Sequence, residues 1–153
     1  FQVDAEMADE VYVPGGGTEI PFSTENLNSD VMYFQTPHPE KVATYLKKRW
    51  AAALGETAAR LKSGGKTDYL ALRHLAPLDR ETILASLGLD AHQSADLENH
   101  GHHGTNDPLI ALDMGIKQNA VKDGDIVTLL AGGIGFTYAA AAIQWGKQAV
   151  HGG

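Results

Sequence analysis

The sequence contains no cysteine, so neither a disulfide bond nor a catalytic thiolate can come from this chain. Its longest apolar run, residues 138–143, is alanine-rich and far shorter than the roughly 18 residues that suggest a membrane-spanning helix. Positive charge is also scarce, because 12 Lys and Arg residues stand against 19 Asp and Glu, giving a formal net charge of -7. These shortages argue against a membrane protein and against a nucleic-acid-binding protein, which normally carries a basic face.

The composition that remains is typical of a metabolic protein with one compact domain. Hydrophobic residues make up 43% of the chain, which is enough for a real core. Residues 1–10 are acidic where a secretory signal would be basic and then apolar, so we expect a cytoplasmic protein. The first residue is Phe1 rather than Met, from which we expect a processed chain, an expressed fragment or a piece of a longer polypeptide.

Apolar periodicity predicts a long first helix over residues 39–62, followed by Gly64 and Gly65. Apolar residues recur there every three or four positions and would form one buried face. That face would consist of Val42, Leu46, Trp50, Leu54, Ala58 and Leu61.

Capping signals predict two further helices. One is expected from Asp79, as its N-cap, to residue 87, with Gly88 ending it. The other begins at Asn106 or Asp107, next to Pro108, and would turn three apolar side chains inward. These three are Leu109, Leu112 and Ile116.

Four segments are predicted as strands: residues 10–13, 69–72, 126–131 and 136–145. The almost continuous apolar character of residues 126–131 indicates a central strand of a sheet. Residues 18–39 show no periodicity and are expected to be mainly loop, residues 122–125 a turn, and residues 151–153 a tail. The order of elements predicts a layered α/β domain that ends in an antiparallel pair of strands.

Histidines are the first candidates for chemistry. His74 directly follows the predicted strand 69–72, and ligand sites commonly lie at such strand ends in α/β sheets. A hydrogen-bonded structural histidine is the alternative for His74. Four more histidines gather in a predicted loop, where their density suits a metal such as zinc but their spacing matches neither a His-x-x-x-His helix nor a zinc finger. Solvated side chains are the other interpretation for His92, His100, His102 and His103.

Two glycine clusters resemble phosphate-binding loops only superficially. Residues 14–17 follow a predicted strand but do not run into a helix, so the anion site of a helix N-terminus is missing. Residues 132–135 lie between two predicted strands, which excludes a dinucleotide fingerprint. The second cluster is either a plain hairpin turn or a place where backbone N–H groups form an oxyanion hole.

Residues 97–113 resemble the late segment of β-ketoacyl-ACP synthase III, in which a His-Gly-Asn-Thr-Ser loop leads into a helix ending in Ala-Leu-Asp. Residues 121–138 are similar to the same family's Lys-x-Gly-Asp turn, apolar strand, glycine loop and Phe-Thr-Trp. Residues 69–77 resemble the strand that ends in the family's His-Gln-Ala-Asn, and residues 11–18 a loop before its long helix. These matches follow one another in order across nearly the whole chain.

The resemblance implies a thiolase-like layered α/β fold of two similar halves, of which this chain would be the C-terminal one, with a mixed sheet packed by helices. Residues 1–38 would join the halves, and residues 39–150 would form the C-terminal domain. The implied activity is acyl transfer or Claisen condensation, in which a cysteine of the first half takes up an acyl group. A histidine and an asparagine of the second half then promote decarboxylative attack by malonyl-ACP.

The implied partners are a Cys-bearing N-terminal half or partner chain, acyl carrier protein or CoA thioesters, and a second full-length unit in a dimer. No cofactor is implied besides the acyl-CoA or acyl-ACP substrates. The fatty-acid pathway is the family's usual context, and specialised or polyketide metabolism is the alternative. Without a cysteine, the lone chain is expected to have essentially no condensing activity.

Carried over by position, His74 takes the catalytic histidine position and His102 the asparagine position. The backbone amide that completes the oxyanion hole falls on Ile134, between Gly133 and Gly135. A neutral imidazole can donate one N–H, as an asparagine amide does, so His74 and His102 could together stabilise an oxyanion. Alternatively, the histidine at position 102 ended decarboxylation and left plain acyl transfer.

The sequence departs from the family where residues 75–77 (Leu-Ala-Pro) replace Gln-Ala-Asn. This loss, with that of the asparagine, keeps a second hypothesis open, a non-catalytic accessory subunit of a condensing enzyme. A His-rich metal-binding protein is the third.

Overall fold

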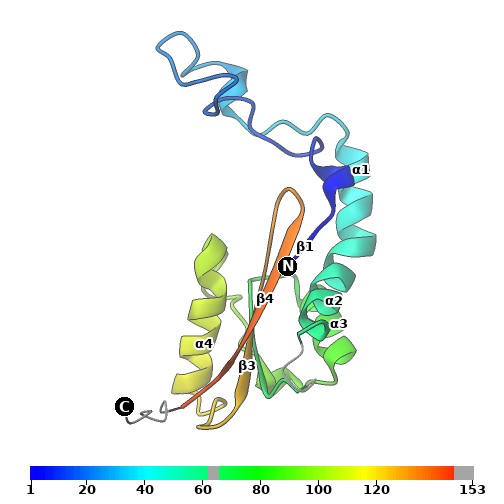
Figure 1. The fold of residues 1–153 in the computed structure, drawn as a ribbon, viewed down its shortest axis with the longest axis vertical. Coiled ribbons are helices and arrows are strands. Elements are labelled where there is room, and N and C mark those ends of the chain that lie inside the picture. Colours follow the sequence, from blue (N-terminus) through cyan, green and yellow to red (C-terminus); the bar gives the residue numbers. More distant parts are fainter. Residues whose placement is uncertain (62–65, 147–153) are drawn as a thin grey trace, which may run out of the picture.

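The computed structural model of the chain describes residues 1–61 and 66–146, whose arrangement is shown in Figure 1. Within these described residues lie four α-helices: α1 (Pro39–Tyr45), α2 (Ala51–Ala59), α3 (Pro77–Leu87) and α4 (Asp107–Lys117). A π-helical turn, η3 (Leu46–Trp50), joins α1 to α2, and short 3₁₀ turns are η1 (Ala5–Met7), η2 (Asp30–Met32), η4 (Ala91–Gln93) and η5 (Gly104–Asn106). No helix in this described part of the chain has the length and apolar character needed to span a membrane.

The strands β1 (Gln2–Val3), β2 (Tyr69–Leu72), β3 (Ile126–Gly133) and β4 (Thr137–Gln144) form one mixed sheet in the order β1-β4-β3-β2. β2 runs parallel to β3, with Leu72 opposite Leu130. β3 and β4 form the predicted antiparallel hairpin, which starts with Ile126 opposite Gln144. Because β3 has a neighbour on both sides, the prediction that this apolar segment lies inside the sheet is confirmed.

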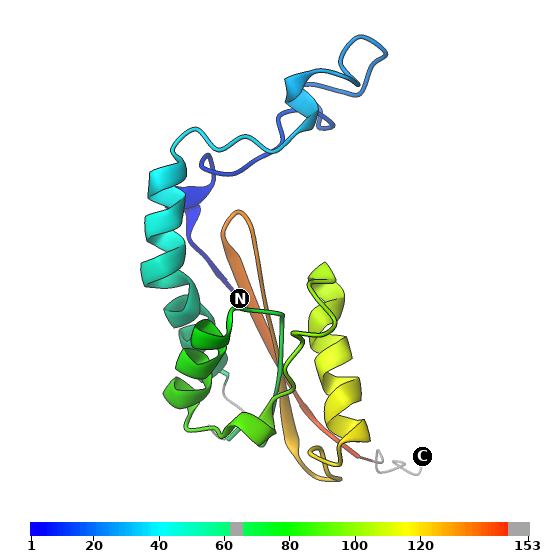
Figure 2. The ribbon, with the colours of Figure 1, turned by 180° about the vertical axis from the view of Figure 1, so that it is seen from behind.

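Helices cover both faces of the sheet. Figures 1 and 2 show α4 on one face and α1, α2 and α3 on the other, so the layers are helix, sheet and helix. The alternation of side chains along β2 serves both layers: Leu70 and Leu72 pack with the α1–α3 side, whereas Tyr69 and Ala71 pack with α4. All four side chains are buried, which explains why residues 69–72 read as a continuous apolar run. The predicted layered α/β domain is confirmed.

The long first helix is present, but its apolar face differs from the predicted one. Leu46 is 41% exposed, and Tyr45 is buried in its place. The π-helical turn is the reason, since an i→i+5 turn holds one residue more than an α-helical turn and shifts which side chains face the core. Val42, Trp50, Leu54 and Ala58 are buried as predicted, and Leu61 is half-buried beyond the helix end.

Other predicted boundaries need correction. α3 begins at Pro77, two residues before Asp79, because a proline suits the first helical position. Gly88 ends α3 in the left-handed conformation, as predicted. In α4 only Leu112 of its three predicted inward residues is buried, because the sheet side of this helix is formed by its small residues. Leu109 and Ile116 are exposed instead, whereas Ala111 and Gly115 face the sheet.

The predicted strand over residues 10–13 is wrong. Residues 8–38 leave the sheet as an extended arm, the dark-blue to cyan segment in Figure 1, so this stretch has no neighbouring strand to pair with. Only Tyr12 forms an isolated bridge, with Gln35, and Gly15 donates to the carbonyl of Val31. Residues 18–38 are irregular apart from η2, as predicted.

The hairpin connection is shorter than predicted, since Gly132 and Gly133 still belong to β3 and pair with β4. The turn 122–125 is present. Several predictions fall outside the described residues, namely the helix end at Lys62, Gly64 and Gly65 after it, the domain end at residue 150 and the tail 151–153.

Candidate active site

The candidate site lies where the parallel strands β2 and β3 end side by side. Arg73 continues the pairing one residue past β2, because its backbone N–H donates to the carbonyl oxygen of Leu130 at 3.1 Å. His74 comes next in the chain, while β3 continues on the other side to Gly132 and Gly133. The carboxyl ends of adjacent parallel strands are where open α/β sheets commonly place ligands. As the sequence predicted, His74 lies just after a buried strand.

A buried carboxylate, Asp107 at the start of α4, joins the two segments that carry the predicted histidines. Its Oδ2 accepts the backbone N–H of His74 at 2.9 Å and lies 2.5 Å from Nδ1 of His102. Its Oδ1 accepts the backbone N–H of His103 at 2.6 Å. The Asp107 side chain has 0% exposure. Burial by itself raises the pKa of this carboxyl, but the hydrogen bonds from His74, His103 and His102 outweigh it and hold the pKa below its usual value.

Arg73 extends this network to the β3 strand. Its Nη1 donates to the carbonyl oxygen of Gly132 at 2.5 Å, and its Nη2 lies 3.3 Å from Nε2 of His102. The guanidinium carbon is 5.0 Å from the centre of the Trp50 ring, within cation–π range. Burial lowers the pKa of Arg73, and the negative charge of Asp107 opposes that change. The cation is thus held between an aromatic ring, a strand carbonyl and an imidazole.

A cleft of about 590 Å³ opens at this point, between the β3–β4 hairpin and the loop before α4. Of the five predicted site residues, His102, Gly133 and Ile134 line it. Gly135 follows at the tip of the hairpin. His74 shares the Asp107 carboxylate through its backbone, but its side chain is not among the lining groups. The remaining lining residues are Arg73, Gly104, Thr105, Ala131, Gly132, Thr137 and Ala139.

The loop histidines do not gather into a metal-binding group. Across residues 1–61 and 66–146 there is no set of three or more His, Cys, Asp or Glu side chains arranged to hold a metal ion. His102 is turned toward Asp107, and Nε2 of His103 lies 2.8 Å from the carbonyl oxygen of His100. Both rings are therefore engaged in contacts within the protein.

Two residues central to this network were absent from the predicted site. Asp107 was considered only as a helix cap, although a carboxylate at the start of a helix beside a histidine-rich loop is a signal for a hydrogen-bonded pair. Arg73 directly precedes His74, but nothing in the local sequence distinguishes it from a solvent-exposed arginine. Only the pairing of β2 with β3 places its guanidinium over Trp50 and next to His102.

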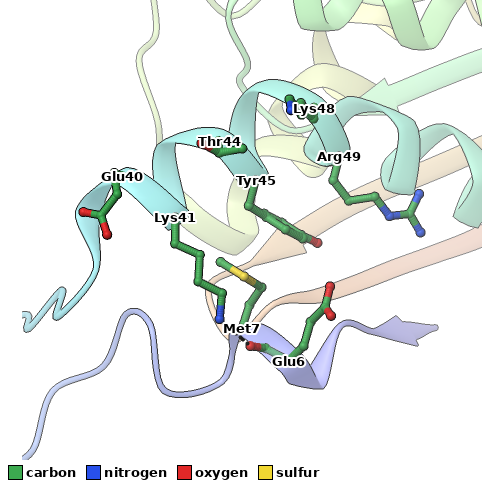
Figure 3. A pocket seen from close by; sticks show the side chains of 8 residues that line it. All are labelled: Glu6, Met7, Glu40, Lys41, Thr44, Tyr45, Lys48 and Arg49. Atoms are coloured by element: carbon green, nitrogen blue, oxygen red, sulfur yellow. Dashed lines mark hydrogen bonds between the residues drawn. The ribbon is translucent and has the colours of Figure 1, made fainter.

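A second hollow, of about 470 Å³, lies between η1 and the α1–η3 helix (Figure 3). Its charged side chains contact neighbouring groups: Lys41 Nζ lies 2.6 Å from Glu10 Oε1, and Arg49 Nη1 lies 2.8 Å from Glu56 Oε1. No predicted site residue lines this hollow. Its lining residues are Glu6, Met7, Glu40, Lys41, Thr44, Tyr45, Lys48 and Arg49.

Comparison with known proteins gives a consistent result. β-Ketoacyl-[acyl-carrier-protein] synthase III of Symbiobacterium thermophilum is 25% identical over 140 residues, covering 90% of this chain and 42% of that protein. The enzyme of the same name from Desulfitobacterium hafniense is 27% identical over 144 residues, with the same coverage. The chain therefore spans less than half the length of these relatives.

A solved structure, 3-oxoacyl-(acyl carrier protein) synthase III from Pseudomonas aeruginosa PAO1, matches with a TM-score of 0.69 at 16% identity, over 95% of this chain and 43% of that one. This likeness confirms the predicted thiolase-like fold of the C-terminal half. The family described as 3-oxoacyl-[acyl-carrier-protein (ACP)] synthase III C terminal matches residues 66–145, which include β2, α3, α4, β3 and β4. The chain belongs to this family.

Proposed function

We propose that this chain is the histidine-bearing half of a thioester-using acyltransferase of the synthase III type. The observation that supports this most directly is the shared Asp107 carboxylate, which joins the segments of His74 and His102 beside a cleft lined by the β3–β4 hairpin. The nucleophilic cysteine comes from an N-terminal half or a partner chain, because this chain has none. The proposed substrates are acyl-CoA or acyl-ACP thioesters, and the name of a relative, β-ketoacyl-[acyl-carrier-protein] synthase III, supports the carrier-protein form.

In the proposed reaction, the partner's thiolate attacks an acyl thioester, and the carrier leaves as its thiolate while the acyl group passes to the cysteine. A malonyl thioester then loses CO₂, and the resulting carbanion attacks the acyl-cysteine and releases the thiolate. Negative charge builds on a thioester oxygen in each step, so fixed N–H donors near that oxygen lower the barrier. His74 is proposed as one such donor and the Ile134 backbone amide as another.

The first test is native mass spectrometry of this chain purified with a Cys-bearing half, with and without a medium-chain acyl-CoA. The proposal expects a complex in which the Cys-bearing chain gains one acyl group. Failure to form that complex, or a complex that takes up no acyl mass, would count against a split acyltransferase.

The second test is His74→Ala in the assembled protein. Loss of a positioned catalytic imidazole is expected to reduce acyl transfer by roughly 10²–10⁴-fold. The matched control is His92→Ala, since His92 is exposed in η4 and lines no part of the cleft. If His74→Ala leaves the rate unchanged, the catalytic role is wrong.

An accessory, non-catalytic subunit is the second candidate function. The observation that favours it is Leu75-Ala76-Pro77 where the family has Gln-Ala-Asn, which removes polar groups next to His74. An accessory subunit would stabilise the Cys-bearing partner equally well with or without the His74 imidazole. The His74→Ala experiment therefore also separates these two functions.

A further inference from the structure

Both ring nitrogens of His102 are already in use. The Asp107 carboxylate is buried, and its lowered pKa keeps it ionised at neutral pH, so it can only accept hydrogen bonds. The proton between Asp107 and His102 therefore lies on Nδ1 of the ring. Arg73 can only donate, so the 3.3 Å contact between its Nη2 and Nε2 of His102 requires an unprotonated Nε2. In this arrangement His102 has no N–H left to offer to a ligand in the cleft.

Arg73, by contrast, has donors to spare. Its guanidinium carries more N–H groups than its contacts with the Gly132 carbonyl and His102 use, and its buried Nε has no hydrogen-bond partner among the described residues. Within residues 1–61 and 66–146 the side chain forms no ion pair. The charge of Asp107 favours the Arg73 cation, but His102 lies between the two groups, so no carboxylate contacts the guanidinium directly. A partly buried cation without a contacting anion is unfavourable, and Arg73 lines the cleft.

We propose that Arg73 binds the negatively charged oxygen of the ligand in this cleft and that His102 is a positioning residue that orients Arg73. The ligand chemistry is a single oxygen anion, either the oxyanion that forms on a thioester or a substrate carboxylate. This assignment rests on the proposed acyltransferase function and deepens it. It moves the donor that the family resemblance places at position 102 to a cationic side chain on the neighbouring strand end.

The neighbours of Arg73 fit this role. Trp50 supports the guanidinium without neutralising its charge, and Gly132 lets that ring approach, because a Cβ on Gly132 would lie 3.0 Å from the Trp50 ring. A cation held in place before the reaction stabilises a developing oxyanion more than it stabilises the neutral thioester. This difference in stabilisation between the oxyanion and the neutral thioester lowers the barrier. A neutral N–H donor gives a smaller difference than a cation does.

Acetate is a suitable probe because it presents the same charged oxygen and needs no partner chain. Titration of the ¹⁵N-labelled chain with acetate, followed by NMR, is expected to move the signals of Gly133, Ile134 and the Arg73 side chain together in a saturable way. Arg73→Met is expected to weaken acetate binding by roughly tenfold or more, since it removes a charge-assisted hydrogen bond. Arg73→Lys should bind with intermediate affinity because it keeps the charge but not the planar fork.

The control is Arg49→Met, which removes an arginine that contacts Glu56 outside the cleft and should leave acetate binding unchanged. The same samples report the His102 tautomer through long-range ¹H–¹⁵N correlations, where a proton on Nδ1 and none on Nε2 is expected. Acetate binding that survives Arg73→Met, or a proton on Nε2 of His102, would overturn the proposal. If Arg73→Met does not give a dispersed, folded spectrum, equal acetate affinity in wild type and Arg73→Lys would refute it instead.

Failure of this assignment can be distinguished from failure of the proposed function. If acetate binds through Arg73 but the assembled protein transfers no acyl group, the anion site is supported and the acyltransferase function is refuted. If acyl transfer depends on His74 but is unaffected by Arg73→Met, the acyltransferase function is supported and the proposed role of Arg73 is refuted.

Discussion

Replacement of Asp107 by asparagine is the most informative single change in this chain, because one buried carboxylate holds three groups at once. It accepts the backbone N–H groups of His74 and His103 and contacts the His102 ring. An asparagine side chain at this position would have nearly the same shape but only one acceptor oxygen. With its oxygen at the Oδ2 position, the amide would keep the contacts with His74 and His102 and turn its NH₂ group toward the His103 backbone N–H, which is itself a donor. At least one of the three contacts should therefore be lost.

The magnitude follows from the number of lost contacts. A hydrogen bond to a charged group contributes about 1.5–3 kcal/mol, so losing one costs about 1.5–3 kcal/mol of unfolding free energy. For a chain of this size that corresponds to a fall in melting temperature of roughly 3–12 °C. Urea denaturation at pH 7 measures the difference. Asp113→Asn is the matched control, because Asp113 is exposed on the same helix and its pair with Lys117 should contribute under about 1 kcal/mol.

The loss should also depend on pH. The folded pKa of Asp107 lies below its unfolded value, which is about 3.9 for an unperturbed aspartate. Stability from such a group is present above the unfolded pKa and disappears as pH falls through the folded pKa. The difference between wild type and Asp107→Asn should therefore be constant near neutral pH and shrink below about pH 4. A difference that stays the same down to pH 3, or one no larger than that of Asp113→Asn, would refute the reasoning.

Two further changes test how α4 is fixed to the sheet. Gly115→Ala should destabilise the fold by about 1–3 kcal/mol in urea denaturation, because a Cβ there would overlap the buried Tyr69 ring, whereas Gly17→Ala, with open space around it, should have little effect. Tyr69→Phe should cost about 1–3 kcal/mol by the same assay, since the hydroxyl donates to the Ala111 carbonyl at 2.8 Å and accepts the Ala95 N–H at 3.0 Å. An unchanged midpoint for either variant would mean that α4 and β2 are less tightly packed than described.

The strands that build the site were predictable because their signals are local. Residues 69–72 and 126–131 are short apolar runs bounded by turn residues, and both became strands of the sheet. The helix over 39–59 was predictable for the same reason, but its buried face was not. The π-helical turn depends on how the helix packs as a whole, so periodicity alone placed Leu46 in the core instead of Tyr45.

The errors elsewhere have a common physical cause, the absence of tertiary information. Residues 10–13 have strand composition but leave the sheet with the arm, so no partner strand is available to them. In α4 the large residues Leu109 and Ile116 point outward because close contact with β2 requires small side chains at Ala111 and Gly115. The prediction that the largest apolar residues of α4 are buried failed here, because the close approach of the α4 and β2 backbones leaves room only for the smallest side chains.

The same contact explains why the candidate site could be located but not fully assembled from sequence. The Tyr69 hydroxyl and Gly115 fix the position of α4 on β2, and the start of α4 carries Asp107. β2 in turn leads directly into Arg73 and His74, so the distance between Asp107 and these two residues is determined by helix packing rather than by any local motif. A histidine at a strand end and a histidine in a loop can each be recognised alone. Their connection through one buried carboxylate, and the place of Arg73 beside it, follow only when helix and strand are packed together.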